Sequence, residues 1–262
     1  MTARGADWNP ETYSRFRDLR LRPALDLLGR VGDLPDGAAL DLGCGNGAAG
    51  PALAHRYRPG RRLIGLDASP NMLDAAGAKG CYDDLIPADV TEWRADTPLA
   101  LIFSNAALQW LPDHAGLFPR LAGYLAPGGT LAVQMPRQYG APSHRFLRDF
   151  AADMFPDRFP LADRVAPVAP PVDYHRMLST RWGRSMSGKP IMCSALAPSD
   201  NGHPVRRFTE ATAMRPYLDR MNGDEIAAFL SRYDKALEAA YPVEADGSVL
   251  FPFRRLFFTL TV

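Results

Sequence analysis

Short apolar runs and helical stripes alternate along the first half of the chain. Four runs have the length of buried strands; they cover residues 38–42, 63–66, 99–103 and 130–134. A helix is predicted from His114, because Leu117, Leu121 and Leu125 recur at the spacing of a helix that packs on a sheet. Strands that alternate with helices in this way predict an α/β fold.

Beyond Pro136 the pattern changes to helices and loops. Helices are predicted over 143–154, over about 209–221 with a kink at Pro216, and from an Asn222-x-x-Glu225 capping box onward. The N-terminal residues 8–30 are also predicted to be helical, with a restart at Pro23.

The stretch 155–174 differs from both halves, because it contains five prolines. Prolines at this density exclude a helix or a central strand, so an ordered loop or lid is predicted there. Residues 195–206 are loop-like as well, and 256–262 form a final strand.

The loop after the first apolar run is the most informative feature for function. Residues 38–42 lead into Gly43, Gly45 and Gly47, and glycines at alternate positions let the backbone turn tightly and approach a ligand that a Cβ would exclude. The second run ends in Asp67, twenty residues after Gly47. This layout is typical of a βαβ unit that binds a nucleoside, whose acid holds the ribose hydroxyls.

Two kinds of cofactor fit that layout. Gly43-x-Gly45-x-x-Ala48 also satisfies the looser dinucleotide pattern of NAD(P) and FAD sites. Asp41, however, directly precedes the loop, where its carboxylate would repel a pyrophosphate. S-adenosylmethionine has no phosphate and carries a sulfonium and an ammonium group, so the acid favours it.

The arrangement Asp41-x-Gly43-x-Gly45-x-Gly47 resembles motif I of the class I S-adenosylmethionine-dependent methyltransferases. Further segments match that family in the right order: 69–73, 88–90, 104–105 and 125–129. The resemblance implies a Rossmann-like sheet that is mostly parallel, with an antiparallel last strand and a helical cap.

The same resemblance implies which residues hold the cofactor. Asp67 is expected to bind the ribose, Asp89 to reach the adenine amino group, and Asn105 and Gln109 to face the methyl donor. The expected cofactor-binding residues are Asp41, Gly43, Gly45, Gly47, Asp67, Ala68, Met72, Asp89, Val90, Asn105 and Gln109.

Longer strings are similar to the trans-aconitate 2-methyltransferase family and extend over nearly the whole chain. They are residues 7–13, 20–24, 104–114, 133–136, 142–145, 215–218 and 251–257. The similarity implies O-methylation of a carboxylate of a small acid, with S-adenosylhomocysteine as the second product. We therefore expect four parts: N-terminal cap helices over 1–30, a cofactor-binding core over 31–136, a mostly helical substrate cap over 137–248 with a core strand near 184–196, and a final core strand over 249–262.

One segment departs from that family. Where its members have a strand of the form Val-x-x-Trp-Glu-Thr-x-Tyr, residues 184–193 read Arg-Ser-Met-Ser-Gly-Lys-Pro-Ile-Met-Cys. An altered acceptor pocket leaves an alternative function open: methylation of carbon, nitrogen or a hydroxyl, or a non-methylating reaction, in secondary metabolism. A non-catalytic binding module is disfavoured by the intact acids and glycines of the loop.

The acceptor decides which side chains the chemistry requires. A carboxylate is already ionised at neutral pH and needs no general base, and an arginine fork suits it. The substrate-binding candidates are Trp8, Tyr13, Arg215, Tyr217, Arg254 and Arg255. A hydroxyl or a carbon acid would need a base, for which His144 and His175 are the candidates in the expected cap.

Composition narrows the class of partner. The 262 residues are 47% hydrophobic with a net charge of +1, so neither a nucleic-acid footprint nor a membrane-binding surface is predicted. The three cysteines show no metal-ligand spacing, which predicts no metal and fits a reduced cytoplasmic setting. A small-molecule acceptor and a monomer or homodimer are expected.

Overall fold

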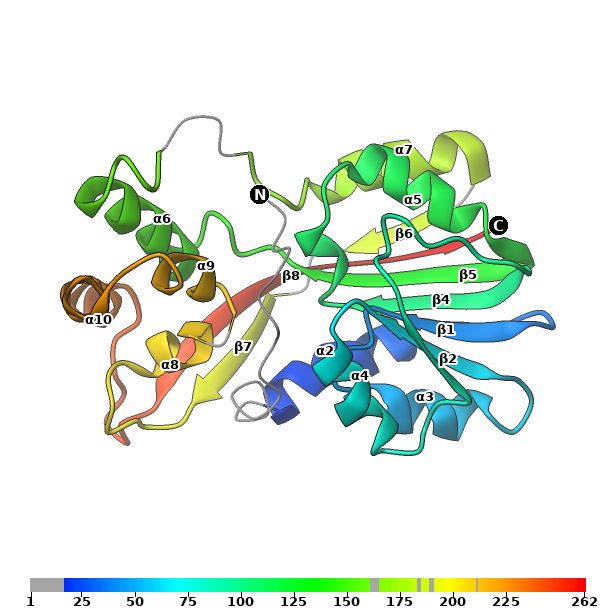
Figure 1. Ribbon diagram of the computed structural model, residues 1–262, viewed down its shortest axis with the longest axis horizontal. Coiled ribbons are helices and arrows are strands. Elements are labelled where there is room, and N and C mark those ends of the chain that lie inside the picture. Colours follow the sequence, from blue (N-terminus) through cyan, green and yellow to red (C-terminus); the bar gives the residue numbers. More distant parts are fainter. Residues whose placement is uncertain (1–16, 161–164, 183–184, 189–190, 211) are drawn as a thin grey trace. The chain divides into compact units, whose positions relative to one another are not determined.

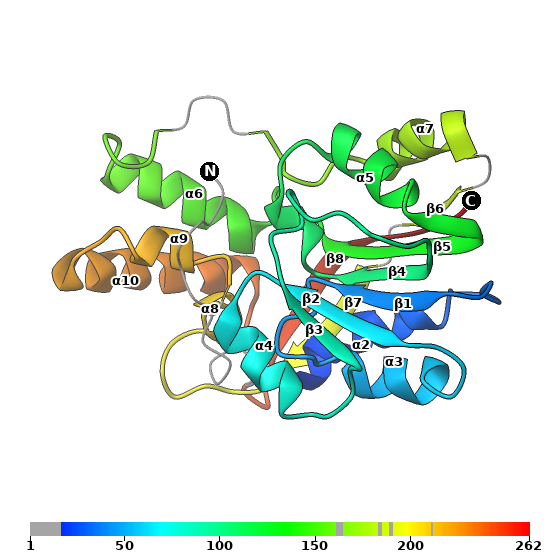
Figure 2. The same ribbon diagram turned by 45° about the vertical axis from the view of Figure 1, so that its right-hand side comes forward.

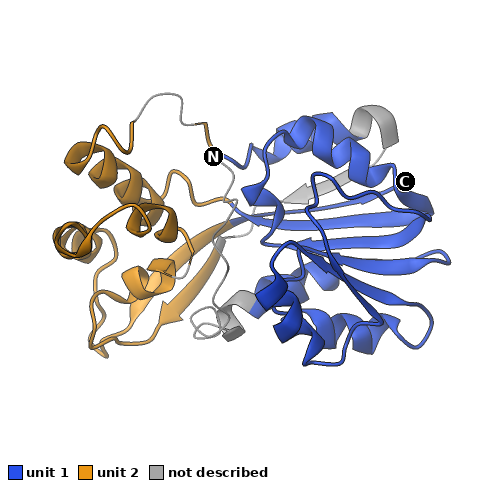
Figure 3. Ribbon diagram, in the orientation of Figure 1, with its two compact units in different colours: residues 1–136, 167–190, 255–262 blue, residues 137–166, 191–254 orange. Residues whose placement is uncertain are grey.

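The computed structural model describes residues 17–160, 165–182, 185–188, 191–210 and 212–262. They fold as two compact units (Figure 3). Unit 1 comprises residues 1–136, 167–190 and 255–262, and unit 2 comprises residues 137–166 and 191–254. Residues 167–190, which we expected in the cap, thus fold with the core. Trp8 and Tyr13 lie outside the described residues.

A single sheet forms the centre of unit 1. Its strands follow the order β3 (Asp84–Pro87), β2 (Leu63–Asp67), β1 (Ala38–Leu42), β4 (Leu99–Asn105), β5 (Leu125–Pro136), β8 (Val249–Thr261) and β6 (Ser185–Gly188). The pairs from β3 to β5 are parallel, whereas β8 runs antiparallel to both of its neighbours. The predicted mostly parallel sheet with an antiparallel last strand is confirmed.

Helices cover both faces of this sheet, as Figures 1 and 2 show. One face carries α2 (Arg17–Leu28), α3 (Gly50–Tyr57) and α4 (Pro70–Gly77), and the other carries α5 (His114–Ala122) and α7 (Pro171–Trp182). On the α5 face, Phe118 packs edge-on against Phe258 with 5.3 Å between ring centroids. Buried apolar side chains on both faces explain why β1 and β4 are almost continuously apolar.

Helix α7 corrects the prediction of a loop over 155–174. The helix begins at Pro171. Proline is well suited to this position, because the N–H groups of a first helical turn have no partner within the helix and the one that proline lacks is not needed. Tyr174 is fully buried, and its hydroxyl shares a 2.6 Å hydrogen bond with Nδ1 of His114. Nε2 of the same ring lies 2.9 Å from the carbonyl oxygen of Leu108. The imidazole therefore joins α7 to the turn that follows β4.

Local signals at helix ends decide several other boundaries. Ser69 caps α4 as predicted, since its hydroxyl accepts the N–H of Met72. The predicted helix over 209–221 is instead two, α8 (Pro204–Glu210) and α9 (Arg215–Leu218), because Pro204 and Pro216 each lie in a first turn. The predicted restart at Pro23 is also wrong, because α2 continues through it.

Unit 2 is built on α6 (Pro142–Met154) and α10 (Gly223–Ala240), which pack together. The Asn222/Glu225 capping box at the start of α10 is confirmed. Strand β7 (Ile191–Leu196) pairs with residues 249–254 of β8. The single strand expected near 184–196 is therefore two strands, of which β6 belongs to unit 1 and β7 to unit 2.

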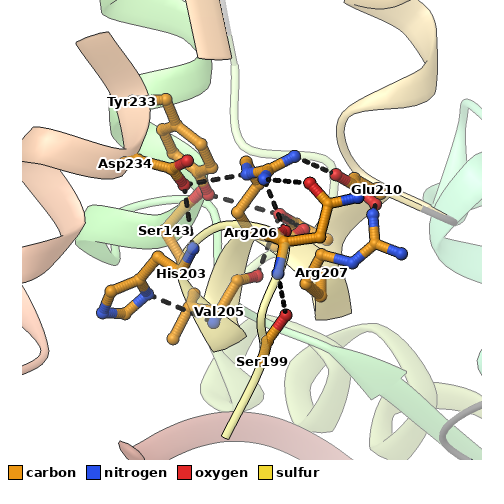
Figure 4. Close-up of polar contacts among 11 residues, drawn as sticks. Ser143, Ser199, His203, Val205, Arg206, Arg207, Glu210, Tyr233 and Asp234 are labelled. Carbon is orange, nitrogen blue, oxygen red and sulfur yellow. Dashed lines mark hydrogen bonds and ion pairs between the residues drawn. The ribbon is translucent and has the colours of Figure 1, made fainter. Parts of the chain in front are cut away.

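Arg206 joins α8 to α10 inside unit 2 (Figure 4). Its guanidinium is buried, with Nε 2.9 Å from a carboxylate oxygen of Asp234 and Nη2 donating to the carbonyl oxygen of Asn201. Nη1 contacts Glu210. Gly202 has a φ of +85°, and a Cβ there would collide with the guanidinium. One planar side chain thus fixes a loop and two helices.

Arg206→Met is expected to lower the free energy of unfolding by about 3 kcal/mol, because it leaves the partly buried carboxylate of Asp234 without its cation and Glu210 with Arg207 alone. Arg232→Met is the matched control, since the Arg232–Asp153 pair is exposed on both sides. It should cost about 1 kcal/mol or less. Urea unfolding of both variants makes the comparison. Equal losses would mean that the Arg206 network does not stabilise unit 2 beyond a surface pair.

Candidate functional site

The loop after β1 has the backbone that its glycines permit. Gly43, Gly45 and Gly47 have φ angles of +71°, +54° and +70°, which residues with a Cβ rarely adopt. A Cβ on Gly43 would collide with the methyl group of Ala107, in the loop after β4. A Cβ on Gly45 would meet no atom of the described residues within 4 Å. The glycine loop therefore touches the loop after β4, while no described residue covers its middle.

Asp67 ends β2 beside this loop. One carboxylate oxygen accepts the N–H of Gly45 at 2.8 Å, and the other accepts the N–H of Ser69 at 2.9 Å. The side chain is half-buried. These bonds hold the carboxylate against the glycine loop, at the position where a ribose-binding acid is expected.

Asp41 lies beneath the loop and is only 2% exposed. Burial raises its pKa to about 7, the hydrogen bond from Tyr82 opposes that shift, and the nearby charge of Asp67 adds to it. The hydroxyl of Tyr82 donates to Oδ2 of Asp41 at 2.7 Å. The same ring packs where Gly47 and Gly50 lack a side chain.

Tyr82 carries no signal in the sequence that marks it as part of this site. It lies two residues before β3 and stands 41 positions from Asp41, so no local spacing relates the two residues. The glycines at 47 and 50 were the available signal, because they make room for a large ring. Burial, reinforced by the charge of Asp41, raises the pKa of the Tyr82 hydroxyl, which therefore stays a hydrogen-bond donor.

The remaining expected cofactor residues lie around the same edge. Asp89 accepts hydrogen bonds from the N–H and the hydroxyl of Thr91 at 2.8 and 2.6 Å, so its carboxylate is held close to its own turn. Met72 and Val90 are buried, whereas Ala68 is exposed.

Two amide side chains at the end of β4 contain unpaired buried atoms. Oδ1 of Asn105 and Oε1 of Gln109 have no hydrogen-bond partner among the described residues. The Gln109 amide nitrogen donates to the carbonyl oxygen of Ala106, a residue whose φ of +56° is unusual outside glycine. Because a buried carbonyl oxygen without a donor costs free energy, these atoms fit the donor groups of a ligand.

The candidate bases differ sharply. His144 is half-buried, and its Nδ1 lies 3.0 Å from Oγ of Ser143. Burial and, to a lesser extent, Arg148 lower its pKa to about 4, so the ring is neutral at pH 7 and a weak base. His175 is exposed on α7, in unit 1 rather than in the expected cap.

The candidate substrate arginines occupy both units. Arg215 and Tyr217 lie on α9 of unit 2, and both are half-buried. Arg254 is exposed in unit 2, while Arg255 is buried in unit 1 and pairs with Pro136 at the carboxyl end of β5. Successive residues of a strand point to opposite faces, so these two neighbours cannot act alike.

Known proteins resemble this chain over nearly its whole length. The trans-aconitate 2-methyltransferase of Methylobacterium radiotolerans is 40% identical over 96% of this chain and 97% of its own length. That of Methylobacterium nodulans is 41% identical over 96% and 97%. Residues 39–129 match the methyltransferase domain family. The chain belongs to the trans-aconitate 2-methyltransferase family.

Membership of this family confirms the predicted enzyme class. The chain is an S-adenosylmethionine-dependent methyltransferase, and the NAD(P) and FAD alternatives are set aside. The fold agrees with solved structures. The YcgJ protein from Bacillus subtilis aligns with a TM-score of 0.58 at 14% identity, over 92% of this chain and 98% of its own. Phosphoethanolamine N-methyltransferase 2 of Haemonchus contortus aligns with a TM-score of 0.52 at 18% identity, over 92% of this chain and 52% of its own.

The residues of this family member fit its cofactor. Three features together suit a ligand that carries ribose hydroxyls and an ammonium group: space at Gly45 that no described residue fills, a carboxylate fixed beside the loop at Asp67, and amide oxygens at the end of β4 that no described residue pairs. Within the described part of the chain, no group of His, Cys, Asp and Glu side chains is arranged to hold a metal ion, and no helix is long and apolar enough to cross a membrane.

Asp41 makes stability depend on pH. Below about pH 4 this carboxyl is protonated in both the folded and the unfolded chain. Between about pH 4 and pH 7 it is ionised in the unfolded chain but still protonated in the folded chain, and above about pH 7 it is ionised in both, at a cost to the folded chain. The stability of the wild type relative to Asp41→Asn should therefore fall as pH rises through this window, by up to about 4 kcal/mol. Urea unfolding of both proteins at several pH values measures the difference. Parallel stability curves would contradict a raised pKa at this carboxyl.

Proposed function

We propose that this methyltransferase methylates a carboxylate oxygen of a small polycarboxylic acid of the trans-aconitate type. The observation that carries the proposal is the buried guanidinium of Arg255. It lies at the carboxyl end of β5, the same edge of the unit 1 sheet at which the glycine loop follows β1. A guanidinium at that edge is suited to a carboxylate acceptor. The relatives named for trans-aconitate methylation, 40% identical, support the same substrate class.

When bound, S-adenosylmethionine supplies a methyl group on a positively charged sulfur, and transfer to a carboxylate leaves a methyl ester and S-adenosylhomocysteine. A carboxylate is ionised at neutral pH and needs alignment rather than proton removal. The lowered pKa of His144 agrees with this, because a ring with a pKa of about 4 is a poor general base at pH 7.

The proposed role of each cofactor-binding residue follows from its position in unit 1. Asp67 binds the ribose hydroxyls, the glycines at 43, 45 and 47 let the backbone approach the ligand, and Asn105 and Gln109 accept from its ammonium group. Asp41 supports the loop from beneath through Tyr82. Asp89 is proposed to reach the adenine amino group. To do so, the Asp89 carboxylate would accept a hydrogen bond from the adenine amino group in addition to those from Thr91.

The proposed setting is the cytoplasm, with a small-molecule acceptor, no nucleic-acid partner, and a monomeric or homodimeric enzyme. The cysteines support a reduced compartment: all three are free thiols, and Cys193 is exposed. The near-zero net charge of +1 supports a small ligand rather than nucleic acid.

Asp67→Ala is expected to weaken binding of S-adenosylhomocysteine by about 1.5–3 kcal/mol, because it removes charge-assisted bonds to the ribose. Calorimetric titration measures the affinity. Asp74→Ala, which removes an exposed carboxylate from α4, is the matched control and should bind as the wild type does. Equal affinity in all three proteins, or tight binding of NADH, would contradict the assignment of Asp67.

Replacing an arginine that pairs with the acceptor should weaken acceptor binding by about 2–5 kcal/mol if the pair is buried. Methionine keeps much of the aliphatic bulk and removes the charge. Among Arg215→Met, Arg254→Met and Arg255→Met, the largest loss is expected at Arg255, which is only 6% exposed. Affinity for S-adenosylhomocysteine should stay near that of the wild type.

Steady-state kinetics of the three variants, with acidic acceptors found in a metabolite screen, test whether one of these arginines binds the acceptor. Full activity in all three variants, or an uncharged best acceptor, would contradict the carboxylate proposal. A general base, with His144 and His175 as candidates, would then be required.

A further inference from the structure

We propose that Gln134 binds the carboxylate acceptor directly, as a neutral donor beside Arg255. This inference rests on the proposed function, since it names a further residue of the same acceptor site. It is carried by the location of Gln134 in the sheet and by the state of its amide group.

Gln134 lies near the carboxyl end of β5, where it is cross-strand partner to Asn105 of β4 and Phe257 of β8. Its neighbours Val133 and Met135 belong to the apolar cluster on the α5 face. Because strand side chains alternate between faces, the Gln134 side chain points to the opposite face, with those of Asn105 and Phe257.

The amide of Gln134 is fully buried, and neither its oxygen nor its nitrogen has a hydrogen-bond partner among the described residues. Its backbone is paired, since its carbonyl oxygen accepts the N–H of Ala106 at 2.9 Å. Burying an amide without partners costs free energy that an apolar side chain of similar size would not cost. An apolar residue would suit this strand better unless a ligand completes the amide's hydrogen bonds.

A second buried glutamine shows how this chain treats an amide that has a structural role. Gln138 is 2% exposed, and both ends of its side chain are paired. Its Nε2 donates to the carbonyl oxygen of Pro252 at 3.2 Å, and its Oε1 accepts the N–H of Arg254 at 3.0 Å. The lack of partners at Gln134 is therefore not a general property of buried amides in this protein.

The place of β5 in the sheet favours the acceptor over the cofactor as the ligand. The glycine loop follows β1 and Asp67 ends β2, while β4 separates β1 from β5. In open α/β sheets the crevice at the switch in strand order lies here, between β1 and β4. The cofactor is assigned to the ends of β1 and β2 and to the residues that end and follow β4, so β5, the next strand, is on the side left for the second substrate.

Arg255 lies diagonally across the strand pair from Gln134, because Phe257 pairs with Gln134 and Arg255 pairs with Pro136. Diagonal neighbours on one face are within reach of long side chains. A guanidinium forms strong charge-assisted bonds, whereas a neutral amide donates more weakly. We assign Arg255 to the charge of the acid and Gln134 to the orientation of the carboxylate that is methylated, whose nucleophilic lone pair a weaker donor leaves available.

The test is binding of trans-aconitate to the enzyme–S-adenosylhomocysteine complex by calorimetry, together with the melting temperature of each ligand-free protein. Gln134→Met should weaken trans-aconitate binding at least about fivefold and leave S-adenosylhomocysteine affinity within about twofold of the wild type. It should also raise the melting temperature by about 2–4 °C, because the buried amide is gone. Gln138→Met, the matched control, should lower the melting temperature, because it removes the side-chain partners of the Pro252 carbonyl oxygen and the Arg254 N–H.

Each other outcome overturns the inference in a recognisable way. If the wild type binds trans-aconitate and Gln134→Met binds it equally well, this inference fails while the proposed function stands. If the wild type binds no polycarboxylate, both fail. A parallel loss of S-adenosylhomocysteine affinity would assign Gln134 to the cofactor. A lower melting temperature for Gln134→Met than for the wild type would mean that the amide already has a partner without ligand.

Discussion

The close approach of two loops is the constraint on which the cofactor end of unit 1 depends. Gly43, directly after β1, lies against Ala107, which follows β4, and a Cβ at position 43 would remove the contact. Because β1 and β4 are adjacent and parallel, this contact joins the loops on either side of the switch in strand order. Asp67 and the Asn105 amide are consequently presented at one edge, and a small shift of either loop would separate them.

Strand β8 extends the same arrangement toward the proposed acceptor site. It contributes residues 249–254 to unit 2 and 255–262 to unit 1, so the boundary between the units falls between Arg254 and Arg255. Pairing with β5 brings Arg255 to the carboxyl end of that strand, one diagonal step from Gln134. The antiparallel last strand therefore places the buried Arg255 at the edge of the sheet where the parallel strands end.

Much of the fold, and the backbone of the glycine loop in the candidate cofactor site, could be predicted because their signals are local. Apolar runs predict β1, β2, β4 and β5, and glycines at alternate positions predict the loop. What could not be predicted depends on tertiary contacts. Tyr82 is distant in sequence from Asp41, and Gln134 is one polar residue within an apolar run. The helix at Pro171 differs from the loop that the proline density predicts, because burial of Tyr174 stabilises a helix there.

The most direct test of the account is the identity of the product. Incubation of the enzyme with trans-aconitate and S-adenosylmethionine, followed by mass spectrometry, should give one monomethyl ester for each S-adenosylhomocysteine formed, and mild alkaline hydrolysis should return the acid. A methylated product that resists alkaline hydrolysis, or no methyl transfer to any carboxylic acid, would contradict it.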